Sequence, residues 1–299
     1  MKILLTGSNG FLGKLISLEL EKENQIFGLS RNSGNYKVLL EKSVPVFIDH
    51  FDLVIHCAGK AHSIPKTEVQ KKDFYDVNVL GTQNLLKGLD KSKLPKKFIF
   101  ISSVSVYGKD TGSYIQENHP LQAIDAYGKS KFEAEKIIIN WCEENNIICT
   151  ILRLPLLVGK EPPGNLGAMI KAIIKGYYFN IGGGKAKKSM VLGKDVASVI
   201  IKVASIGGIY NLTDGHHPNF DELSLAISKN KNKKKPINLP MKVAFIIGKV
   251  GDLLRGKAPI DSLKIKKMTS DLTFDDTKAR TILDWNPQSV IDYINKNKI

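Results

Sequence analysis

Short apolar runs and amphipathic stretches alternate along the first half of the chain. Runs rich in Leu, Ile and Val predict strands, whereas apolar residues spaced by three and four predict helices. In the first such helix Leu12, Ile16 and Leu20 share one face. The predicted elements are, in chain order, "KILLTG", "FLGKLISLELEKE", "QIFGLS", "DLVIHCAG", residues 67 to about 90, "KKFIFISS", about 126–145 and "IICTILRLP". Short apolar strands between helices indicate a parallel sheet covered on both faces.

The pattern changes twice along the chain. Residues 31–51 are too few for a full α/β unit, so one repeat is predicted to be shortened. After Pro155 the chain is rich in loops, followed by a predicted helix at about 194–205 and a strand, "GIYNLT", that could rejoin the sheet. We therefore predict an α/β protein with two domains. A doubly wound, Rossmann-type parallel sheet takes residues 1–153 plus about 185–212, and a smaller, partly discontinuous C-terminal α/β substrate domain takes about 154–184 and 213–299.

The chain has 299 residues and a formal charge of +15, from 44 basic and 29 acidic residues. A polyanionic partner, an anionic small substrate and a generally lysine-rich composition would each produce this excess. The densest basic run, residues 229–236, has no interleaved aromatic residues and is typical of a solvated loop, so we expect no nucleic-acid partner. Residues 241–257 are amphipathic and basic, and we expect a helix of the small domain there rather than one on a membrane surface.

Cysteine content and hydropathy suggest the compartment. Cys57, Cys142 and Cys149 are odd in number and form no Cys-x-x-Cys pair, so neither a disulfide framework nor a metal site is expected. The N-terminal apolar run is too short for a signal peptide, and no apolar run approaches the roughly 20 residues that cross a bilayer. We therefore expect a cytoplasmic protein.

A glycine-rich turn follows the first strand and opens the first helix. Gly7, Gly10 and Gly13 in "TGSNGFLG" have the spacing Gly-x-x-Gly-x-x-Gly, which differs from the Gly-x-Gly-x-x-Gly fingerprint. Glycines let a backbone approach a pyrophosphate closely, and the helix N-terminus adds free N–H groups and partial positive charge. This context predicts a dinucleotide site.

The residues after the second predicted strand bear on the cofactor. An acidic residue there would accept a hydrogen bond from the ribose 2′-hydroxyl of NAD. This chain instead has Ser30 and Arg31, and the planar guanidinium of an arginine suits a 2′-phosphate. We therefore predict NADP(H) as the cofactor, with NAD(H) as the alternative.

Tyr127 and Lys131 lie four residues apart, and so on one face of a predicted helix. A strand ending in Ser102 and Ser103 precedes them, with Ser105 two residues beyond, at the edge where open α/β sheets bind ligands. A phenol with a pKa of about 10 is a poor base at neutral pH, and a nearby ammonium lowers that pKa. The pair could therefore exchange the proton of an alcohol while hydride moves to or from a nicotinamide.

Five motifs together resemble one known family. They are "TGSNGFLG", "HCAG", "VNVLGT", "FISSVSVYG" and "YGKSK". With them the chain resembles, over essentially its whole length, the extended short-chain dehydrogenase/reductases, and among these the nucleotide-sugar epimerase, dehydratase and reductase group.

The resemblance implies a role for each matching position. Tyr127 would be the acid/base, Lys131 its partner and a ligand of the nicotinamide ribose, and Ser103 the group that holds the substrate oxygen. Asn78 would support the active site, and Lys188 stands where the family has a phosphate-binding Arg. The remaining implied contacts are cofactor binding by Gly7, Gly10, Phe11, Leu12, Gly13, Ser30, Arg31, Ala58 and Gly59, and substrate binding by Asn165 and Leu166.

One departure from the family narrows the reaction. Val104 and Ser105 stand where the 4,6-dehydratases carry an Asp-Glu pair, which argues against a dehydratase and against the related decarboxylases. The resemblance then implies an NAD(P)-dependent oxidoreductase acting at C4 of a nucleoside-diphosphate hexose, in particular a UDP-hexose. A 4-keto reductase is favoured, a UDP-sugar 4-epimerase is the alternative, and a non-catalytic dinucleotide-binding scaffold is the rival class. We also expect a homodimer, in which Ile137, Ile138 and Trp141 pair between subunits unless they belong to the core.

Overall fold

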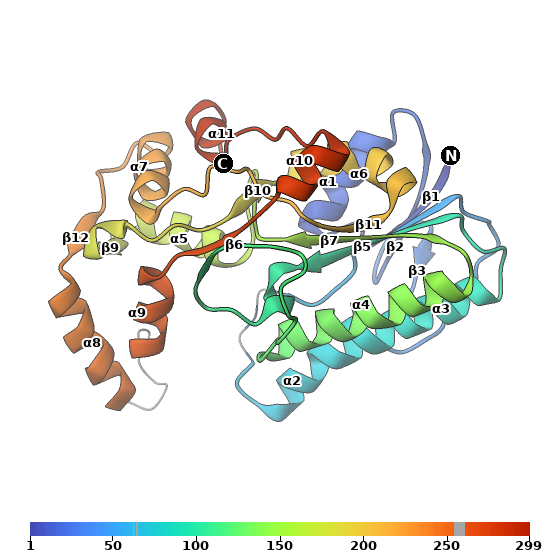
Figure 1. Cartoon of the computed structure of the whole chain (residues 1–299), viewed down its shortest axis with the longest axis horizontal. Helices are drawn as coiled ribbons and strands as arrows, with labels where there is room; N and C mark the ends of the chain where they lie inside the picture. The colour runs from blue at the N-terminus through green and yellow to red at the C-terminus, as the bar shows by residue number, and fades with distance from the viewer. Residues whose placement is uncertain (62, 64, 254–260) are drawn as a thin grey trace.

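A computed structural model describes all residues except 62, 64 and 254–260, and its centre is a seven-stranded parallel sheet (Figure 1). The strand order is β11-β7-β5-β4-β1-β2-β3. From β1 the chain winds outward first to β2 and β3 and then to the other side, which is the doubly wound arrangement that was predicted. The strands are β1 (Lys2–Thr6), β2 (Gln25–Ser30), β3 (Tyr36–Lys37), β4 (Leu53–His56), β5 (Lys97–Ser103), β7 (Ile148–Leu154) and β11 (Gly208–Asn211).

Helices cover both faces of this sheet, because its strands are apolar on both sides. Ile3 and Leu5 point into one core and Leu4 into the other, following the two-residue period of a strand. The first core is closed by α1 (Phe11–Leu20), α6 (Gly193–Ile206) and α10 (Thr277–Leu283). The second is closed by α3 (Gly81–Asp90) and α4 (Ala126–Glu144), which lie below the sheet in Figure 1. Helix α2 (Glu68–Tyr75) leads into α3 through a π-helix at Asp76–Leu80.

The shortened repeat lies at the β3 edge. Residues 31–35 connect β2 to its parallel neighbour β3, and no helix forms within residues 38–52, all of which the structure describes. Tyr36, Phe47 and Phe51 pack edge to face there instead, with ring centroids 5.2–6.1 Å apart. At the opposite edge the predicted strand "GIYNLT" rejoins the sheet as β11, paired with β7.

The second part of the molecule is built of short helices and three two-stranded sheets. Its main core unites α5 (Gly164–Ile174), α7 (Phe220–Asn230) and α11 (Val290–Lys296). A smaller core lies between α8 (Met241–Leu253) and α9 (Ser262–Thr269). The paired strands are β8 (Leu156–Val158) with β10 (Met190–Leu192), β9 (Phe179–Ile181) with β12 (Ile237–Leu239), and β6 (Gly112–Ile115) with β13 (Leu272–Phe274).

The cores cross the domain boundaries that the sequence predicts. Leu283 and Trp285, from the segment assigned to the substrate domain, pack in the core of the large sheet. Met190 and Leu192, assigned to the dinucleotide domain, pack in the core of the smaller part. The division at those residues therefore stays a prediction.

Three residues considered for a subunit interface are instead in the core. Ile138 and Trp141 are buried, Ile137 packs beside them, and Trp141 Nε1 donates to Asp90 Oδ1 at 2.7 Å. The homodimer stays a prediction without these residues. Among the described residues, no helix is both long enough and apolar enough to cross a membrane. The predicted helix at 241–257 is observed up to Leu253, and residues 254–257 lie outside the described part of the chain.

His56 is a buried polar centre that ties together β1, β4 and α3. Thr82 donates its hydroxyl proton to Asn78 O at 2.7 Å, so His56 Nε2 donates to Thr82 Oγ1 at 2.9 Å. His56 Nδ1 then accepts from Thr6 Oγ1 at 2.7 Å, which assigns a neutral tautomer from the network. Burial, together with the smaller effect of the Lys131 ammonium, lowers the pKa of His56 from 6.5 to about 3.

This burial predicts acid sensitivity. Between pH 6.5 and about 3 the unfolded chain protonates His56 while the folded chain does not, so the free energy of unfolding falls as the pH falls. At about pH 4.5 the loss from this group is about 2–3 kcal/mol relative to pH 7. We expect His56→Gln to lose that part of the pH dependence in urea unfolding, and His50→Gln, at an exposed position, to keep it. Equal pH dependence in wild type and His56→Gln would contradict the assignment.

Candidate active site

A cleft of about 1500 Å³ opens along the carboxyl ends of the large sheet's strands and extends to the start of α5. Pockets for a single small ligand usually measure roughly 300–1000 Å³, so this one has room for a dinucleotide and a second molecule. Most of the residues singled out from sequence line it. They are Gly7, Gly10, Phe11, Leu12, Ser30, Arg31, Ala58, Gly59, Ser103, Tyr127, Lys131 and Asn165. Within the described residues, no cluster of three His, Cys, Asp or Glu side chains could hold a metal ion.

The glycine turn brings backbone to the floor of the cleft. Gly7 has φ +67°, and a Cβ there would lie 2.7 Å from Ala58 N. A Cβ on Gly13 would lie 2.1 Å from Gly7 O, so this glycine serves the packing of α1 against the turn and does not line the cleft. Gly10 is the N-cap of α1 and offers no side-chain acceptor, which leaves the first N–H groups of the helix for a ligand.

Tyr127 and Ser103 meet in the cleft. Asp125 caps α4 by accepting from Gly128 N at 2.9 Å, and this places Tyr127 in the first turn. Burial raises the pKa of Tyr127, and its hydrogen bond with Ser103 lowers it by less, so the net shift is upward. Ser103 is itself buried at the end of β5. Phenol and hydroxyl are thus positioned to hold one oxygen atom of a substrate together.

Lys131 lies one turn further along α4 and is almost fully buried. Its Nζ donates to Ile101 O at 2.7 Å and lies 4.4 Å from the centroid of the Phe100 ring. Burial lowers its pKa to about 8, so most of it is still an ammonium at neutral pH. The expectation that this ammonium lowers the pKa of Tyr127 below its usual value is not met, because burial raises that pKa by more than the Ser103 hydrogen bond lowers it.

The Asn78 side chain connects the cleft-lining backbone at Lys60 to helix α4. Its Oδ1 accepts from Lys60 N at 2.7 Å, and its Nδ2 donates to Lys60 O at 3.1 Å and to Ser130 Oγ at 2.8 Å. It lies in the π-helix Asp76–Leu80, a local widening that is frequent at functional sites. The sequence predicted a supporting role for Asn78 but not the π-helix that aims its side chain.

Sequence reasoning missed a buried ion pair behind the site. Glu135 follows Lys131 by four residues on the same face of α4, and Arg153 on β7 binds it with Nη2–Oε2 at 2.8 Å and Nε–Oε1 at 3.2 Å. Both side chains are 2–3% exposed. Ser102 also donates to Glu135, so the strand that ends at Ser103 is held to α4. Continuing the four-residue spacing from Tyr127 through Lys131 to Glu135 would have found the acid, but not its partner.

Cys57 lines the cleft and was not among the site residues that the sequence predicted. Burial raises the pKa of its thiol to about 11, although the Lys131 ammonium opposes the shift. A neutral thiol is a weak nucleophile, so the Cys57 side chain contributes to the shape of this end of the cleft but not to covalent chemistry.

At the other end of the cleft, Arg31 forms an ion pair with Glu41. Arg31 Nη2 lies 3.2 Å from Glu41 Oε1, and both side chains line the cleft. Glu41 comes from the irregular segment after β3, which is why inspection of the end of β2 alone did not reveal it. A ligand here meets a guanidinium and a carboxylate together.

The predicted substrate contacts are only partly assembled. Asn165 is exposed to the cleft in the first turn of α5, whereas the Leu166 side chain is 1% exposed and packs in the core of the smaller part. Lys188 does not line the cleft, and its Nζ donates to Ser270 O at 3.0 Å. Leu166 therefore has only its backbone to offer a ligand, and Lys188 would have to leave Ser270 to reach one, so both contacts stay predictions.

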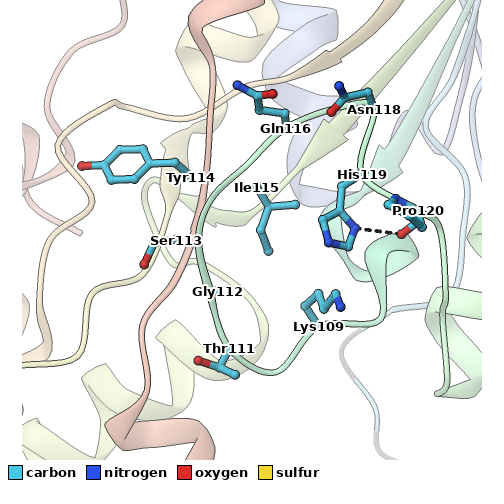
Figure 2. A pocket seen from close by; sticks show the side chains of 10 residues that line it. All are labelled: Lys109, Thr111, Gly112, Ser113, Tyr114, Ile115, Gln116, Asn118, His119 and Pro120. Atoms are coloured by element: carbon cyan, nitrogen blue, oxygen red, sulfur yellow. Dashed lines mark hydrogen bonds between the residues drawn. The ribbon is translucent and has the colours of Figure 1, made fainter.

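A second cavity, of about 570 Å³, lies within the loop of residues 109–120 (Figure 2). Lys109, Ile115 and His119 point toward its centre, Tyr114 points away, and His119 Nδ1 lies 2.9 Å from Pro120 O. It holds neither the phenol–serine pair nor the glycine turn. The chemistry therefore belongs to the larger cleft.

Comparison with known proteins agrees with this geometry. The model of the NAD dependent epimerase/dehydratase family matches residues 3–212. The chain is 28% identical to the N-acetyl-alpha-D-glucosaminyl-diphospho-ditrans,octacis-undecaprenol 4-epimerase of Escherichia coli O157:H7, over 93% of this chain and 88% of that protein. It is 27% identical to the UDP-glucose 4-epimerase of Vibrio cholerae, over 97% and 92%. In structure it resembles the UDP-glucose 4-epimerase of Thermotoga maritima with UDP-glucose, with a TM-score of 0.76, 20% identity and coverage of 99% and 96%.

Proposed function

The chain belongs to the NAD dependent epimerase/dehydratase family, and we propose that it inverts C4 of a hexose carried on a diphosphate. The observation that carries the proposal is the Tyr127–Ser103 pair, which faces the same cleft as the glycine turn and the Lys131 ammonium. A phenol, a hydroxyl and a dinucleotide site in one cleft are what reversible oxidation of a secondary alcohol requires.

The chain's own residues supply binding and proton transfer. Ser103 holds the C4 oxygen, and Tyr127, as its phenolate, takes the proton of the C4 hydroxyl as the alcohol becomes a ketone and returns that proton when the other face is reduced. Lys131 remains charged beside them and offers its ammonium to the nicotinamide ribose. When bound, a dinucleotide would supply the hydride acceptor and donor, and the positive charge of its oxidised form would favour the phenolate of Tyr127 against the effect of burial.

The far side of the cleft suits the diphosphate. Gly164 and Asn165 line it at the N-terminus of α5, where free N–H groups favour an anion. The hexose in the names of the two relatives is carried on UDP in one and on a diphospho-undecaprenol in the other. We take the UDP-hexoses as the first substrate class and include the lipid-linked class in the test.

A 4-keto sugar-nucleotide reductase is the second candidate, and Arg31 is the observation that favours it. A reductase draws on NADPH, and Arg31 suits a 2′-phosphate. Glu41 supports the epimerase, because a carboxylate beside the guanidinium repels that phosphate and can accept from a ribose hydroxyl. We therefore place NAD(H) before NADP(H). Val104 and Ser105 offer no carboxylate next to Ser103, so a dehydratase remains disfavoured.

The first prediction separates the two reactions. Purified protein with UDP-glucose, UDP-N-acetylglucosamine or a polyprenyl-diphosphate hexosamine should interconvert C4 epimers without net change in cofactor absorbance. Stoichiometric consumption of NADPH with a UDP-4-keto-6-deoxyhexosamine would replace the epimerase by the reductase. Cofactor binding with no turnover of any of these substrates would instead indicate a scaffold.

A second prediction tests the acid/base. Tyr127→Phe removes only the hydroxyl that moves the proton, so turnover should fall by ~10²–10⁴-fold while cofactor affinity is nearly unchanged. Tyr114→Phe, at a residue that lines the other cavity, is the matched control and should keep full turnover. Retention of more than about a tenth of the activity in Tyr127→Phe would refute the assignment.

A third prediction concerns the Arg31–Glu41 pair. Wild type should bind NAD(H) more tightly than NADP(H), and Arg31→Ala should weaken NADP(H) more than NAD(H). Glu41→Gln should shift selectivity toward NADP(H) by up to about fivefold, the usual range for an exposed ion pair. Glu19→Gln breaks a comparable pair, with Lys22, outside the cleft and is the control. Tighter NADPH binding in wild type, lost in Arg31→Ala, would restore the NADP preference.

A further inference from the structure

Helix α8 presents an apolar stripe to solvent. Val243, Ile246, Val250 and Leu253 follow one another at i, i+3, i+7 and i+10, which places them on one side of the helix. They are 42%, 62%, 55% and 82% exposed. Single exposed apolar residues are ordinary, but four in line on one helix form a contiguous patch that calls for a partner.

The opposite side of α8 fixes this orientation. Ala244, Gly248 and Gly251 are its buried residues, and they are small enough to let α9 approach closely. A Cβ on Gly248 would lie 2.6 Å from Ile265 Cδ1 and 3.2 Å from Ser262 Cα, so a larger side chain here would force α9 or its side chains to shift. The apolar stripe therefore cannot turn inward without losing the contact between α8 and α9.

Positive charge lies beside the stripe. Lys242 and Lys249 are exposed on α8, seven residues apart. Lys249 Nζ lies 5.4 Å from the centroid of the exposed Phe245 ring, so its stem covers apolar surface while its ammonium stays outside. The carboxylate of Asp252 accepts hydrogen bonds from Ser262 N at 3.0 Å and from Ser262 Oγ at 2.6 Å.

We propose that this face of α8 docks on the surface of a membrane that carries anionic lipids. The apolar stripe would enter the boundary between headgroups and acyl chains while the lysines meet lipid phosphates, as in other interfacial helices. The positive charge of the chain favours an anionic membrane over the two other possible partners. A second copy of a chain with a charge of +15 would bring the same lysines together, and a nucleic acid would leave the apolar stripe without a partner.

The position of α8 fits this role. It lies at the end of the molecule farthest from the β3 edge of the sheet (Figure 1). From the sequence, residues 241–257 were expected to form a helix of the small domain rather than a helix on a membrane surface. The structure makes the two compatible, because one side of α8 packs against α9 while the other faces outward. Nothing in this proposal depends on the reaction at C4.

The test is co-sedimentation of the full chain with two kinds of vesicle, phosphatidylcholine alone and phosphatidylcholine mixed with phosphatidylglycerol. We expect wild type to bind the mixed vesicles at least tenfold more tightly. Ile246→Asn/Leu253→Asn should abolish binding, and Lys242→Gln/Lys249→Gln should weaken it by about fivefold per lysine. Leu18→Asn/Ile48→Asn, which makes the same change at residues 62% and 91% exposed elsewhere, should bind as wild type does.

Three results would overturn the proposal. They are no binding of wild type to either vesicle, equal binding to both, or a soluble dimer that Ile246→Asn/Leu253→Asn converts to monomer without any vesicle binding. Circular dichroism and cofactor titration show whether each variant is folded. Turnover of soluble UDP-hexoses, measured on the same variants, reports on the proposed reaction separately, so either proposal can fail while the other stands.

Discussion

The buried ion pair of Glu135 and Arg153 is the interaction on which the site depends. It joins α4, which carries Tyr127 and Lys131, to β7, and Ser102 adds the end of β5. Removing two charges from water is expensive, and such a pair is tolerated only when the remaining hydrogen-bonding capacity is satisfied. Here both carboxylate oxygens accept from the guanidinium, and Arg153 Nη1 donates further to Tyr107 OH at 3.1 Å and Glu117 O at 3.0 Å. Loss of either partner would leave the other charge buried and unpaired, which would lower the free energy of unfolding by about 3–5 kcal/mol.

The same network continues from the large sheet into the smaller part of the molecule. Tyr107 OH donates to Asn211 Oδ1 at 2.7 Å, and Asn211 Nδ2 donates to Ile115 O at 3.1 Å and Asp275 O at 3.2 Å. Asn211 ends β11, Ile115 ends β6, and Asp275 follows β13. The helix that holds the phenol and the segments that flank the second cavity are therefore positioned by one set of buried polar contacts.

Burial decides the charges around the cleft. It lowers the pKa of His56 to about 3 and raises those of Cys57 and Tyr127, so these three groups are neutral at pH 7. Burial lowers the pKa of Lys131 only to about 8, since Cys57 and the Glu135 carboxylate oppose the shift, so Lys131 keeps most of its charge at pH 7. Lys131 is thus a buried cation next to the neutral His56 and Cys57, available to stabilise negative charge that develops at this end of the cleft.

The sequence by itself determined the sheet, its shortened repeat, the glycine turn and the spacing of Tyr127 and Lys131. Each of these is encoded locally, by a period of two or between three and four residues, or by a residue type that a turn demands. Only the tertiary structure decided that Arg153 meets Glu135, that Glu41 meets Arg31, that Leu166 turns into a core, and that α8 keeps an apolar side in solvent. These contacts join residues from separate elements, and they depend on which strand lies beside which and on how closely helices pack. The pKa shifts belong to the same class, because burial is a property of the assembled molecule.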